Sequence, residues 1–376
     1  MNVLIAPDKF KGTLTAAQVC EALELGLRSS HRPMAFRSFP LADGGEGTLD
    51  VFRWHTQAVE VALTVHDPLM RKINASYLVS RDQTTAFIEM ARASGLALLR
   101  ASERNPLHTT TFGTGELIAH ALDRGVTKIV LGIGGSATND AALGAFSALG
   151  GKVLSDSEER VHSGQRLHRV QQLDFSHLHT RISACEIIAI CDVSNPFYGP
   201  QGAAHMYAPQ KGAGEEDVRT LDQGLQHIAH VIQIQTGIDL QKVAGSGAGG
   251  GFGGGAHALL GARLRPGTDV VFEVTNLSAA VAWADVVITG EGKLDRQTLH
   301  GKLIAGLGAL AHRLGKRTVA VCGVSELSET EAQSLFLDGV FSLTAFAGKE
   351  AALADSAVVL EKLAANVLSE AIVLPS

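Results

Sequence analysis

Residues 2–7 of the chain read NVLIAP, a short run of apolar and β-branched residues that ends in a proline. A charged loop follows at residues 8–12, and residues 15–30 then repeat apolar side chains with the period of an amphipathic helix. Residues 34–42 predict a second strand, and the glycine-rich loop LADGGEG (41–47) leads from it into another helix. This alternation of strand and helix predicts a mostly parallel sheet with helices on both faces.

The C-terminal third repeats the alternation of strand and helix. The sequence ADVVITGEG (284–292) predicts a buried strand, residues 303–315 an amphipathic helix, and residues 317–324 another strand. Residues 339–346 predict a last strand, and a terminal helix is expected at about 355–370. Continuous runs of Val, Ile and Ala are typical of strands that are buried on both faces of a parallel sheet.

The middle of the chain follows a different pattern. Residues 59–91 alternate apolar and polar side chains in two or three segments, which predicts antiparallel strands. Residues 116–151 then return to helix, strand and helix. We therefore predict an α/β protein of two domains. One is discontinuous, comprises residues 1–60 and 281–376, and has a doubly wound parallel sheet, whereas the other is an inserted domain with a mixed sheet at residues 61–280.

Composition limits the classes of partner. The chain has 376 residues with a net charge of −6, and no segment concentrates Lys or Arg, which argues against nucleic acid. No apolar run is long enough to span a bilayer, and the N-terminus lacks the basic region of a signal peptide. The four cysteines form no C-x-x-C pair, so we expect reduced thiols and a cytoplasmic protein. A homodimer is expected only because symmetric dimers are the commonest oligomers.

Polar side chains follow five of the predicted strands, where ligands bind in open α/β sheets. A turn or a helix cap explains any one of them, but not lysines and paired carboxylates at five strand ends together. In chain order, these side chains are Asp8, Lys9 and Lys11; Asp43 and Glu46; Ser136, Thr138, Asn139 and Asp140; Asp192 and Asn195; and Glu291, Lys293 and Asp295.

Two enzyme classes fit these residues. The loop GIGGSAT (132–138) lies between a strand and a helix and could bind phosphate, as phosphoryl transfer requires, although no P-loop or protein-kinase motif is present. The same glycines, with Ala137 and the later Asp156, also outline a dinucleotide fingerprint, so a dehydrogenase remains possible from the residues alone. The glycine tract GSGAGGGFGGG (245–255) predicts either a flexible linker or a tightly packed backbone.

Several long motifs decide between these classes. They include IAPDKFKGTLTA (5–16), PLADGGEGTLD (40–50), IVLGIGGSATND (129–140) and DVVITGEGKLD (285–295). With these motifs the chain resembles type 1 glycerate kinases nearly from end to end. The resemblance implies two α/β domains, one of them flavodoxin-like and discontinuous, with the active site in the cleft between them. It also implies phosphorylation of D-glycerate with ATP and Mg²⁺, with attack by the 2-hydroxyl favoured and attack by the 3-hydroxyl as the alternative.

The resemblance further implies roles for individual residues. Asp43 and Asp192 are alternative general bases, and Lys11 is a further catalytic candidate. Glu46 and Asp295 would hold Mg²⁺. Binding of glycerate is assigned to Asp8, Lys9, Arg92 and Asn195. Binding of the phosphates of ATP is assigned to Gly134, Gly135, Ser136, Thr138, Asn139 and Lys211. For Arg92 and Lys211, a solvated surface charge is an equally good interpretation.

The chain departs from the usual family pattern at a few positions. Lys9 stands where Ser is common, so an added positive charge would alter substrate preference or affinity. Gly12 stands where Glu is common, and Ala141 and Ala142 replace a pair of glycines. We expect the alanine pair to begin a helix, where alanine is more favourable than glycine.

Overall fold

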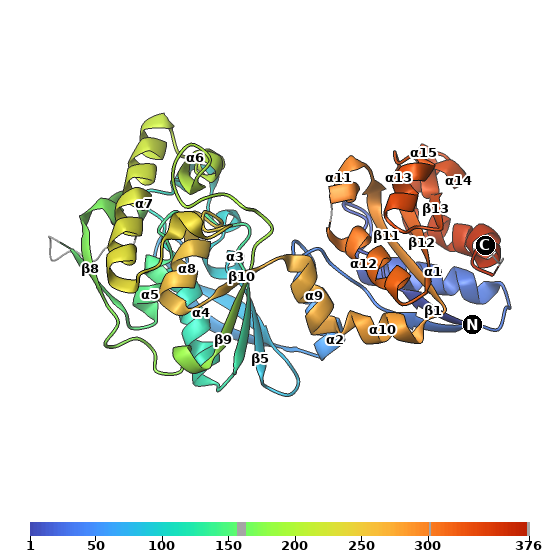
Figure 1. Cartoon of the computed structure of the whole chain (residues 1–376), viewed down its shortest axis with the longest axis horizontal. Coiled ribbons are helices and arrows are strands. Elements are labelled where there is room, and N and C mark those ends of the chain that lie inside the picture. Colours follow the sequence, from blue (N-terminus) through green and yellow to red (C-terminus); the bar gives the residue numbers. More distant parts are fainter. Residues whose placement is uncertain (156–162, 301, 374–376) are drawn as a thin grey trace. The chain divides into compact units, whose positions relative to one another are not determined.

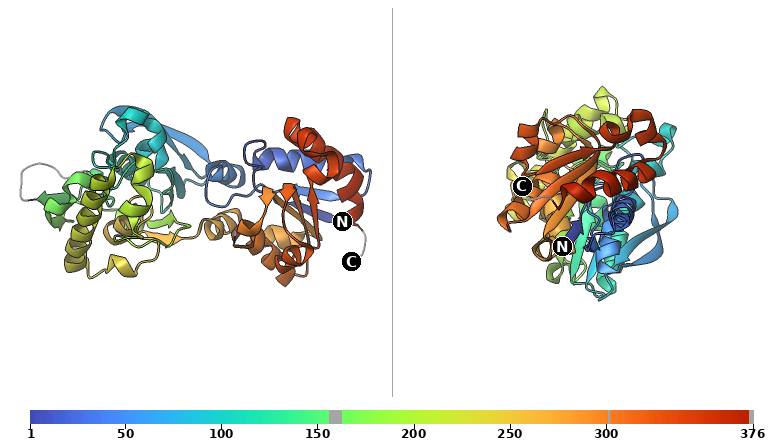
Figure 2. Two further views of the ribbon diagram at one scale, coloured as in Figure 1. Left: turned by 90° about the horizontal axis from the view of Figure 1, so that it is seen from above. Right: turned by 90° about the vertical axis from the view of Figure 1, so that its right-hand side faces the viewer.

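The computed structural model describes residues 1–155, 163–300 and 302–373. They form two compact units (Figures 1 and 2), which we describe separately. Unit 1 comprises Met1–His55 and the chain from Thr268 onward, and unit 2 comprises Thr56–Gly267. The chain thus passes between units at 55/56 and 267/268, where the sequence predicts 60/61 and 280/281. The second boundary comes earlier because helix α10 (Leu277–Trp283) packs on strand β1 of unit 1.

Unit 1 is built on a five-stranded parallel sheet. Its strands are β1 (Asn2–Ile5), β2 (Ala35–Ser38), β11 (Val286–Leu294), β12 (Arg317–Ser325) and β13 (Gly339–Ser342). They lie in the order β13-β12-β11-β1-β2, and each neighbouring pair is parallel. Counted along the chain this order is 2-1-3-4-5, the flavodoxin-like arrangement, so the predicted fold class is confirmed. The sheet changes direction of winding between β1 and β11.

Helices cover both faces of this sheet (Figure 2). Helix α1 contacts β1 and β2 and packs against α16, whereas α10 contacts β1 and α12 contacts β11 and β12. Helix α1 (Ala16–Ser29) begins at Thr15, whose side chain accepts a hydrogen bond from Gln18 in a capping box. Its apolar face is buried in one core cluster with the C-terminal helices. The other helices of unit 1 are α2 (Thr48–Thr56), α9 (Gly267–Thr275), α11 (Arg296–His300), α12 (Lys302–Arg313), α13 (Glu329–Ser334), α14 (Leu343–Ala347), α15 (Lys349–Ala354), α16 (Ser356–Leu363), η7 (Ala364–Leu368) and α17 (Ser369–Ala371).

The last strand is shorter than the sequence predicts. Strand β13 ends at Ser342, and residues 343–347 form helix α14 where a strand to residue 346 is expected. The hydroxyl of Ser342 accepts a hydrogen bond from the Ala345 N–H and so caps this helix. The cap stops the strand although the apolar residues continue.

Unit 2 contains a six-stranded mixed sheet in the order β10-β9-β6-β5-β4-β3. Strands β3, β4 and β5 pair antiparallel, as the alternating pattern predicts, and the remaining pairs are parallel. A separate two-stranded antiparallel sheet consists of β7 (Lys152–Ser155) and β8 (Val170–Asp174). The sheet strands are β3 (Val59–His66), β4 (Lys72–Val79), β5 (Thr85–Glu89), β6 (Lys128–Gly132), β9 (Glu186–Ile190) and β10 (Arg263–Arg265).

The helices of unit 2 pack on a single large apolar core. The α-helices are α3 (Ala91–Ser94), α4 (Phe112–Asp123), α5 (Leu143–Ala148), α6 (Ala203–Tyr207), α7 (Glu215–Thr236) and α8 (Phe252–Leu260). Short 3₁₀ turns are η1 (Leu96–Leu98), η2 (Ala101–Glu103), η3 (Gly164–Arg169), η4 (Ile182–Ala184), η5 (Pro209–Lys211) and η6 (Leu240–Lys242).

The glycine tract 245–255 is a tightly packed backbone and not a linker. Gly249, Gly250 and Gly251 have φ angles of 65°, 75° and 83°, which only glycine adopts without strain. A Cβ atom on Gly250 would lie 2.0 Å from the carbonyl oxygen of Thr138. The tract thus closes directly against the loop that follows β6 and then begins α8.

The alanine pair at 141–142 does not begin a helix, so that prediction is wrong. Ala141 and Ala142 have φ angles of 54° and 63°, and α5 begins only at Leu143. A left-handed conformation costs an L-residue about 1–2 kcal/mol, so the glycines usual in the family would fit here without strain. Both alanines are fully buried, and their packing holds the strained turn in place.

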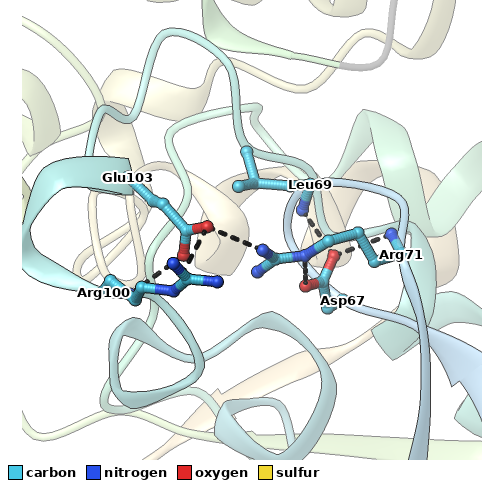
Figure 3. A network of polar contacts seen from close by, with 5 residues as sticks. All are labelled: Asp67, Leu69, Arg71, Arg100 and Glu103. Atoms are coloured by element: carbon cyan, nitrogen blue, oxygen red, sulfur yellow. Dashed lines mark hydrogen bonds and ion pairs between the residues drawn. The ribbon is translucent and has the colours of Figure 1, made fainter.

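A polar network fixes the turn between β3 and β4 (Figure 3). The buried Asp67 carboxylate accepts hydrogen bonds from the N–H groups of Leu69 and Arg71 and from the Arg71 guanidinium, at 2.6–2.9 Å. Arg71 also donates to Glu103, whose carboxylate accepts from the Arg100 N–H. The network therefore connects the turn at 67–71 with η2.

Replacing Asp67 by alanine should lower the free energy of unfolding by about 2–4 kcal/mol, because two backbone N–H groups and a guanidinium lose a buried charged acceptor. Urea unfolding measures this change. Glu103→Ala is the matched control, and we expect it to cost less than about 1 kcal/mol because Arg71 and Arg100 are well exposed. Equal losses for the two variants would show that burial of Asp67 is not what makes its bonds strong.

Candidate active-site residues

In unit 1, Asp8 stands at the carboxyl end of β1, beside the point where the sheet changes its direction of winding. Its N–H donates to the carbonyl of Gly290 in β11 at 2.8 Å, so its backbone is fixed to the neighbouring strand. The side chain is only 8% exposed, and its Oδ1 accepts the N–H of Lys9 at 2.6 Å. This is the position at which open α/β sheets bind ligands.

Acidic neighbours act on Asp8. Burial raises the pKa of the Asp8 carboxyl to about 7, and the charges of Asp43 and Glu291 add to the shift, although Lys9 opposes it. Burial also raises the pKa of Glu291, against a hydrogen bond from Thr298 at 2.7 Å. Asp43, in the loop after β2, and Glu291, in β11, therefore lie near enough to Asp8 for their charges to act on it, and we call these three residues the acidic cluster. Glu291 is among the polar side chains that the sequence places at strand ends, but the sequence assigns it no role, and it lies within β11.

Lys9 ties two loops of unit 1 together. Its Nζ donates to the carbonyl oxygen of Glu46 at 2.7 Å, which links the loop after β1 to the DGGEG loop. In that loop Asp43 accepts the Gly45 N–H at 2.9 Å, and both Asp43 and Glu46 are exposed. The carboxylate of Glu46 makes no hydrogen bond or ion pair with any residue that the structure describes. Lys11 is exposed on the same loop as Lys9.

Asp295 is already engaged within unit 1. Its carboxylate accepts the Gln297 N–H at 2.7 Å and pairs with Lys293 at 3.2 Å. The hydrogen bond from Gln297 and the charge of Lys293 together lower the pKa of Asp295. A metal ion at Asp295 would have to compete with Lys293, whereas Glu46 offers a free carboxylate.

No group of three or more His, Cys, Asp or Glu side chains with the spacing of a metal site occurs among residues 1–155, 163–300 and 302–373. This finding is compatible with Mg²⁺, because enzymes that transfer phosphoryl groups often hold it with one or two carboxylates, water and the phosphates of the substrate. Of the two predicted ligands, Glu46 fits this chemistry better than Asp295 does.

In unit 2, the parallel strands β5, β6, β9 and β10 end at one edge of the sheet, which brings together several predicted side chains. The loop after β6 has two parts: Gly134 and Gly135 are exposed, while residues 136–140 are buried. The backbone of this loop is held by residues 94–96, because Leu96 donates to the Gly135 carbonyl and Ala137 donates to that of Ser94, both at 2.9 Å.

Lys211 supports the same loop from another segment. It is 3% exposed, and its Nζ donates to the Ser136 hydroxyl at 2.8 Å and to the Thr138 carbonyl at 2.7 Å. Burial lowers the pKa of the Lys211 ammonium to about 7, and the nearby Asp140 opposes the shift. Lys211 is therefore not a solvated surface charge.

Asp140 is fully enclosed in unit 2, and burial raises its pKa. Its Oδ2 accepts the Thr111 N–H at 2.7 Å and the Thr111 hydroxyl at 2.8 Å. Some buried polar atoms of the loop have no hydrogen-bond partner among the described residues: Thr138 Oγ1, Asn139 Oδ1 and Nδ2, and Asp140 Oδ1. The buried half of the loop is thus polar, and only Gly134 and Gly135 face solvent.

The other predicted residues of unit 2 have local partners. Arg92 contacts Glu89 at 3.4 Å, and its side chain is 51% exposed. Asp192 accepts the N–H of Gly267 at 3.0 Å, at the start of α9. Asn195 donates to the Gln201 carbonyl at 2.9 Å and accepts from the Tyr207 hydroxyl at 2.6 Å, so its amide braces the 195–207 segment.

The dinucleotide fingerprint does not agree with the structure. In such a motif the helix begins at the glycines, but here α5 begins at Leu143, after the strained alanine pair. Asp156, the acidic residue of the proposed fingerprint, lies outside the described residues. The second glycine pattern, at 245–250, follows the 3₁₀ turn η6 and not a strand.

A chain with acids at the change of winding of a flavodoxin-like unit, and with a glycine loop in a second α/β unit, has groups suited to a small-molecule kinase. The model of the glycerate kinase family matches residues 3–371. The chain therefore belongs to the glycerate kinase family and is a kinase.

Individual relatives agree with this membership. The chain is 42% identical over 344 residues to the glycerate 2-kinase of Escherichia coli, covering 91% of this chain and 90% of the relative. It is 41% identical over 345 residues to a glycerate kinase of Bacillus cereus, with coverage of 92% and 91%. A crystal structure of glycerate kinase 2 from Salmonella typhimurium LT2 superposes with a TM-score of 0.89 at 40% identity, covering 99% of this chain and 98% of that one.

Within the described residues, no helix combines the length and the apolar character needed to cross a membrane.

Proposed function

We propose that the protein transfers the γ-phosphoryl group of ATP to the 2-hydroxyl of D-glycerate, giving 2-phosphoglycerate and ADP. The name of the Escherichia coli relative supports the 2-position over the 3-position. The observation that carries the chemistry is the acidic cluster of Asp8, Asp43 and Glu291 at the change of winding. Such a cluster suits a reaction in which a hydroxyl must lose a proton.

Asp8 is the proton acceptor in this proposal. The hydroxyl oxygen of glycerate attacks the γ-phosphorus, the bond to the ADP oxygen breaks, and the hydroxyl proton passes to the Asp8 carboxylate. A carboxyl with a pKa of about 7 matches the working pH of a general base better than an ordinary aspartate does. Asp43 and Asp192, the bases predicted from the sequence, are both exposed and remain alternatives, which the kcat values of the three asparagine variants would separate.

Other predicted residues keep roles as ligands of the substrates. Lys11 and Arg92 have exposed side chains suited to pairing with the carboxylate of glycerate. Lys9 is held by the Glu46 carbonyl, which would place its charge beside the acidic cluster. Asp295 and Asn195 have local partners, so we assign them a supporting part and no direct contact.

For ATP, the exposed Gly134 and Gly135 would place their backbone against a phosphate group. Buried residues next to them in the loop, Ser136, Thr138 and Asn139, would support this backbone. Mg²⁺, with Glu46 as its ligand from the protein, would neutralise phosphate charge.

We also propose that the enzyme works in the cytoplasm as a homodimer, and sedimentation velocity would test the assembly.

The direct test is one reaction of purified protein, Mg²⁺-ATP and D-glycerate, followed by phosphorus NMR. We expect the resonance of 2-phosphoglycerate to grow as ATP is consumed. A resonance of 3-phosphoglycerate would overturn the assignment of the hydroxyl but leave the kinase in place. L-Glycerate and D-lactate are matched controls, since the first has the opposite configuration and the second lacks the 3-hydroxyl.

A further inference from the structure

We infer that Lys211 is a positioning residue, which holds the loop at 134–138 in the shape that receives the phosphates of the nucleotide and does not touch the phosphates itself. The inference rests on the proposed function, in which this loop binds ATP. It differs from the contact between Lys211 and phosphate that the sequence predicts.

The geometry directs the ammonium group inward. Lys211 ends the 3₁₀ turn η5, which Gly212 closes with a φ of 98°. From there the side chain reaches a loop more than 70 residues earlier in the chain, where its Nζ has two acceptors, Ser136 Oγ and Thr138 O. With 3% of the residue exposed, a phosphate at the surface of unit 2 has no direct path to the ammonium.

The loop is held from two sides. Residues 94–96 bind its backbone at Gly135 and Ala137, and Lys211 binds it at Ser136 and Thr138. Of the two exposed glycines, Gly135 is one of these anchored residues and lies directly before Ser136, which Lys211 holds, and Gly134 precedes it. Removal of the Lys211 anchor would therefore let Gly134 and Gly135 move, although neither residue is itself altered.

The buried charge has a fixed partner. Asp140 acts on Lys211 electrostatically and is itself held by Thr111 through two hydrogen bonds. Arg104 also packs against this turn, since a Cβ on Gly212 would lie 2.1 Å from the Arg104 carbonyl oxygen. Two buried opposite charges add little net stability compared with apolar packing, so their value lies in fixing one arrangement of the segments.

Loss of the proton from Lys211 should weaken the anchor, because hydrogen bonds from a charged donor are about twice as strong as those from a neutral one. Affinity for nucleotide should then fall as the pH rises above about 7. Ser136→Ala removes one acceptor of the ammonium, which favours the neutral amine. This variant should move the fall in affinity to lower pH.

The experiment measures MgADP binding by calorimetry and the KM for ATP with glycerate between pH 6 and 9. We expect Lys211→Met to weaken MgADP binding by about 10–100-fold at pH 6.5, and Lys211→Gln, which keeps a hydrogen-bond donor, to recover most of the loss. Ser136→Ala should have little further effect in the Lys211→Met background, because the two residues act through one bond. Lys242→Met, at a side chain 83% exposed, is the control and should bind like the wild type.

Other results would overturn the inference. If Lys211 contacts phosphate through its charge, Lys211→Gln would bind MgADP as weakly as Lys211→Met. The loss of affinity caused by Ser136→Ala would then add to that of Lys211→Met. Ser136→Ala alone would leave the pH dependence of MgADP binding unchanged. If Lys211→Met does not fold, the pH dependence of Ser136→Ala still decides. A wild type that binds MgADP but never phosphorylates glycerate would overturn the proposed substrate, while the variants would still test the role of Lys211.

Discussion

Asp8→Asn is expected to lower kcat by about 10²–10⁴-fold and, at the same time, to make the protein more stable at pH 8. The loss of activity follows from removal of the proton acceptor. The gain in stability follows because an asparagine in the same place buries no charge. Residues that serve catalysis commonly reduce the stability of the fold in this way.

The sign of the stability effect follows from the pKa of Asp8. Its pKa is about 7 in the folded protein, against an ordinary value of 3.8, so the folded state binds more protons between these values. The contribution of Asp8 to stability is therefore complete below about pH 4 and is lost as the pH rises through 7. At about 1.4 kcal/mol for each pH unit, the wild type loses up to about 4 kcal/mol over this window, and Asp8→Asn removes the loss.

Urea unfolding at pH 4 and pH 8 measures this difference, and a coupled assay measures kcat. Asp50→Asn, at an exposed carboxylate of α2, is the control and should change neither quantity markedly. The kcat/KM of the wild type should rise with pH through about 7. If Asp8→Asn kept full activity while Asp43→Asn or Asp192→Asn lost it, the base would be one of those two residues.

Gly255→Ala is expected to destabilise unit 2 by about 3 kcal/mol. An alanine Cβ at this position would lie 1.9 Å from the carbonyl oxygen of Ala141 and 2.9 Å from the Cβ of Ala142. Alanine is better than glycine in a helix by about 1 kcal/mol, but the clash is with backbone, which cannot rotate away. The strained turn that precedes α5 would have to move, and with it the loop after β6.

Circular dichroism during urea unfolding would measure this loss. Gly132→Ala is the matched control, because its nearest neighbour would be Glu89 Cγ at an ordinary 3.6 Å, and we expect a change within about 1 kcal/mol. If the Gly255→Ala variant had the same free energy of unfolding as the wild type, α8 would be able to shift away from residues 141–142 without a loss of stability, contrary to their close packing.

The sequence is sufficient for the features of the fold that depend on local pattern, because alternating strands and helices predict the parallel sheet of unit 1. The rule that ligands bind at strand ends selects Asp8 and the loop after β6 as site candidates, and that selection stays a prediction. The sequence is insufficient where the answer depends on distant contacts. Burial of Lys211 depends on a loop more than 70 residues away, and the left-handed turn at Ala141 and Ala142 depends on packing against α8. Strand β13 ends at Ser342 because its hydroxyl caps the following helix, and the apolar residues that continue past this position do not reveal that end.

The discontinuity of unit 1 also has a consequence for how the protein is made. The Asn2 N–H binds the carboxylate of Asp285, 283 residues later, and β1 pairs with β11 in the same region. At about 5–20 residues per second, a ribosome needs roughly 15–60 s to deliver that partner. Unit 2 is one continuous segment and can fold first, while β1, whose other neighbour β2 is made early, still lacks its partner β11. The edge of β1 that pairs with β11 is therefore among the last parts of unit 1 to be covered, and we expect residues 2–5 to need protection from other chains during that interval.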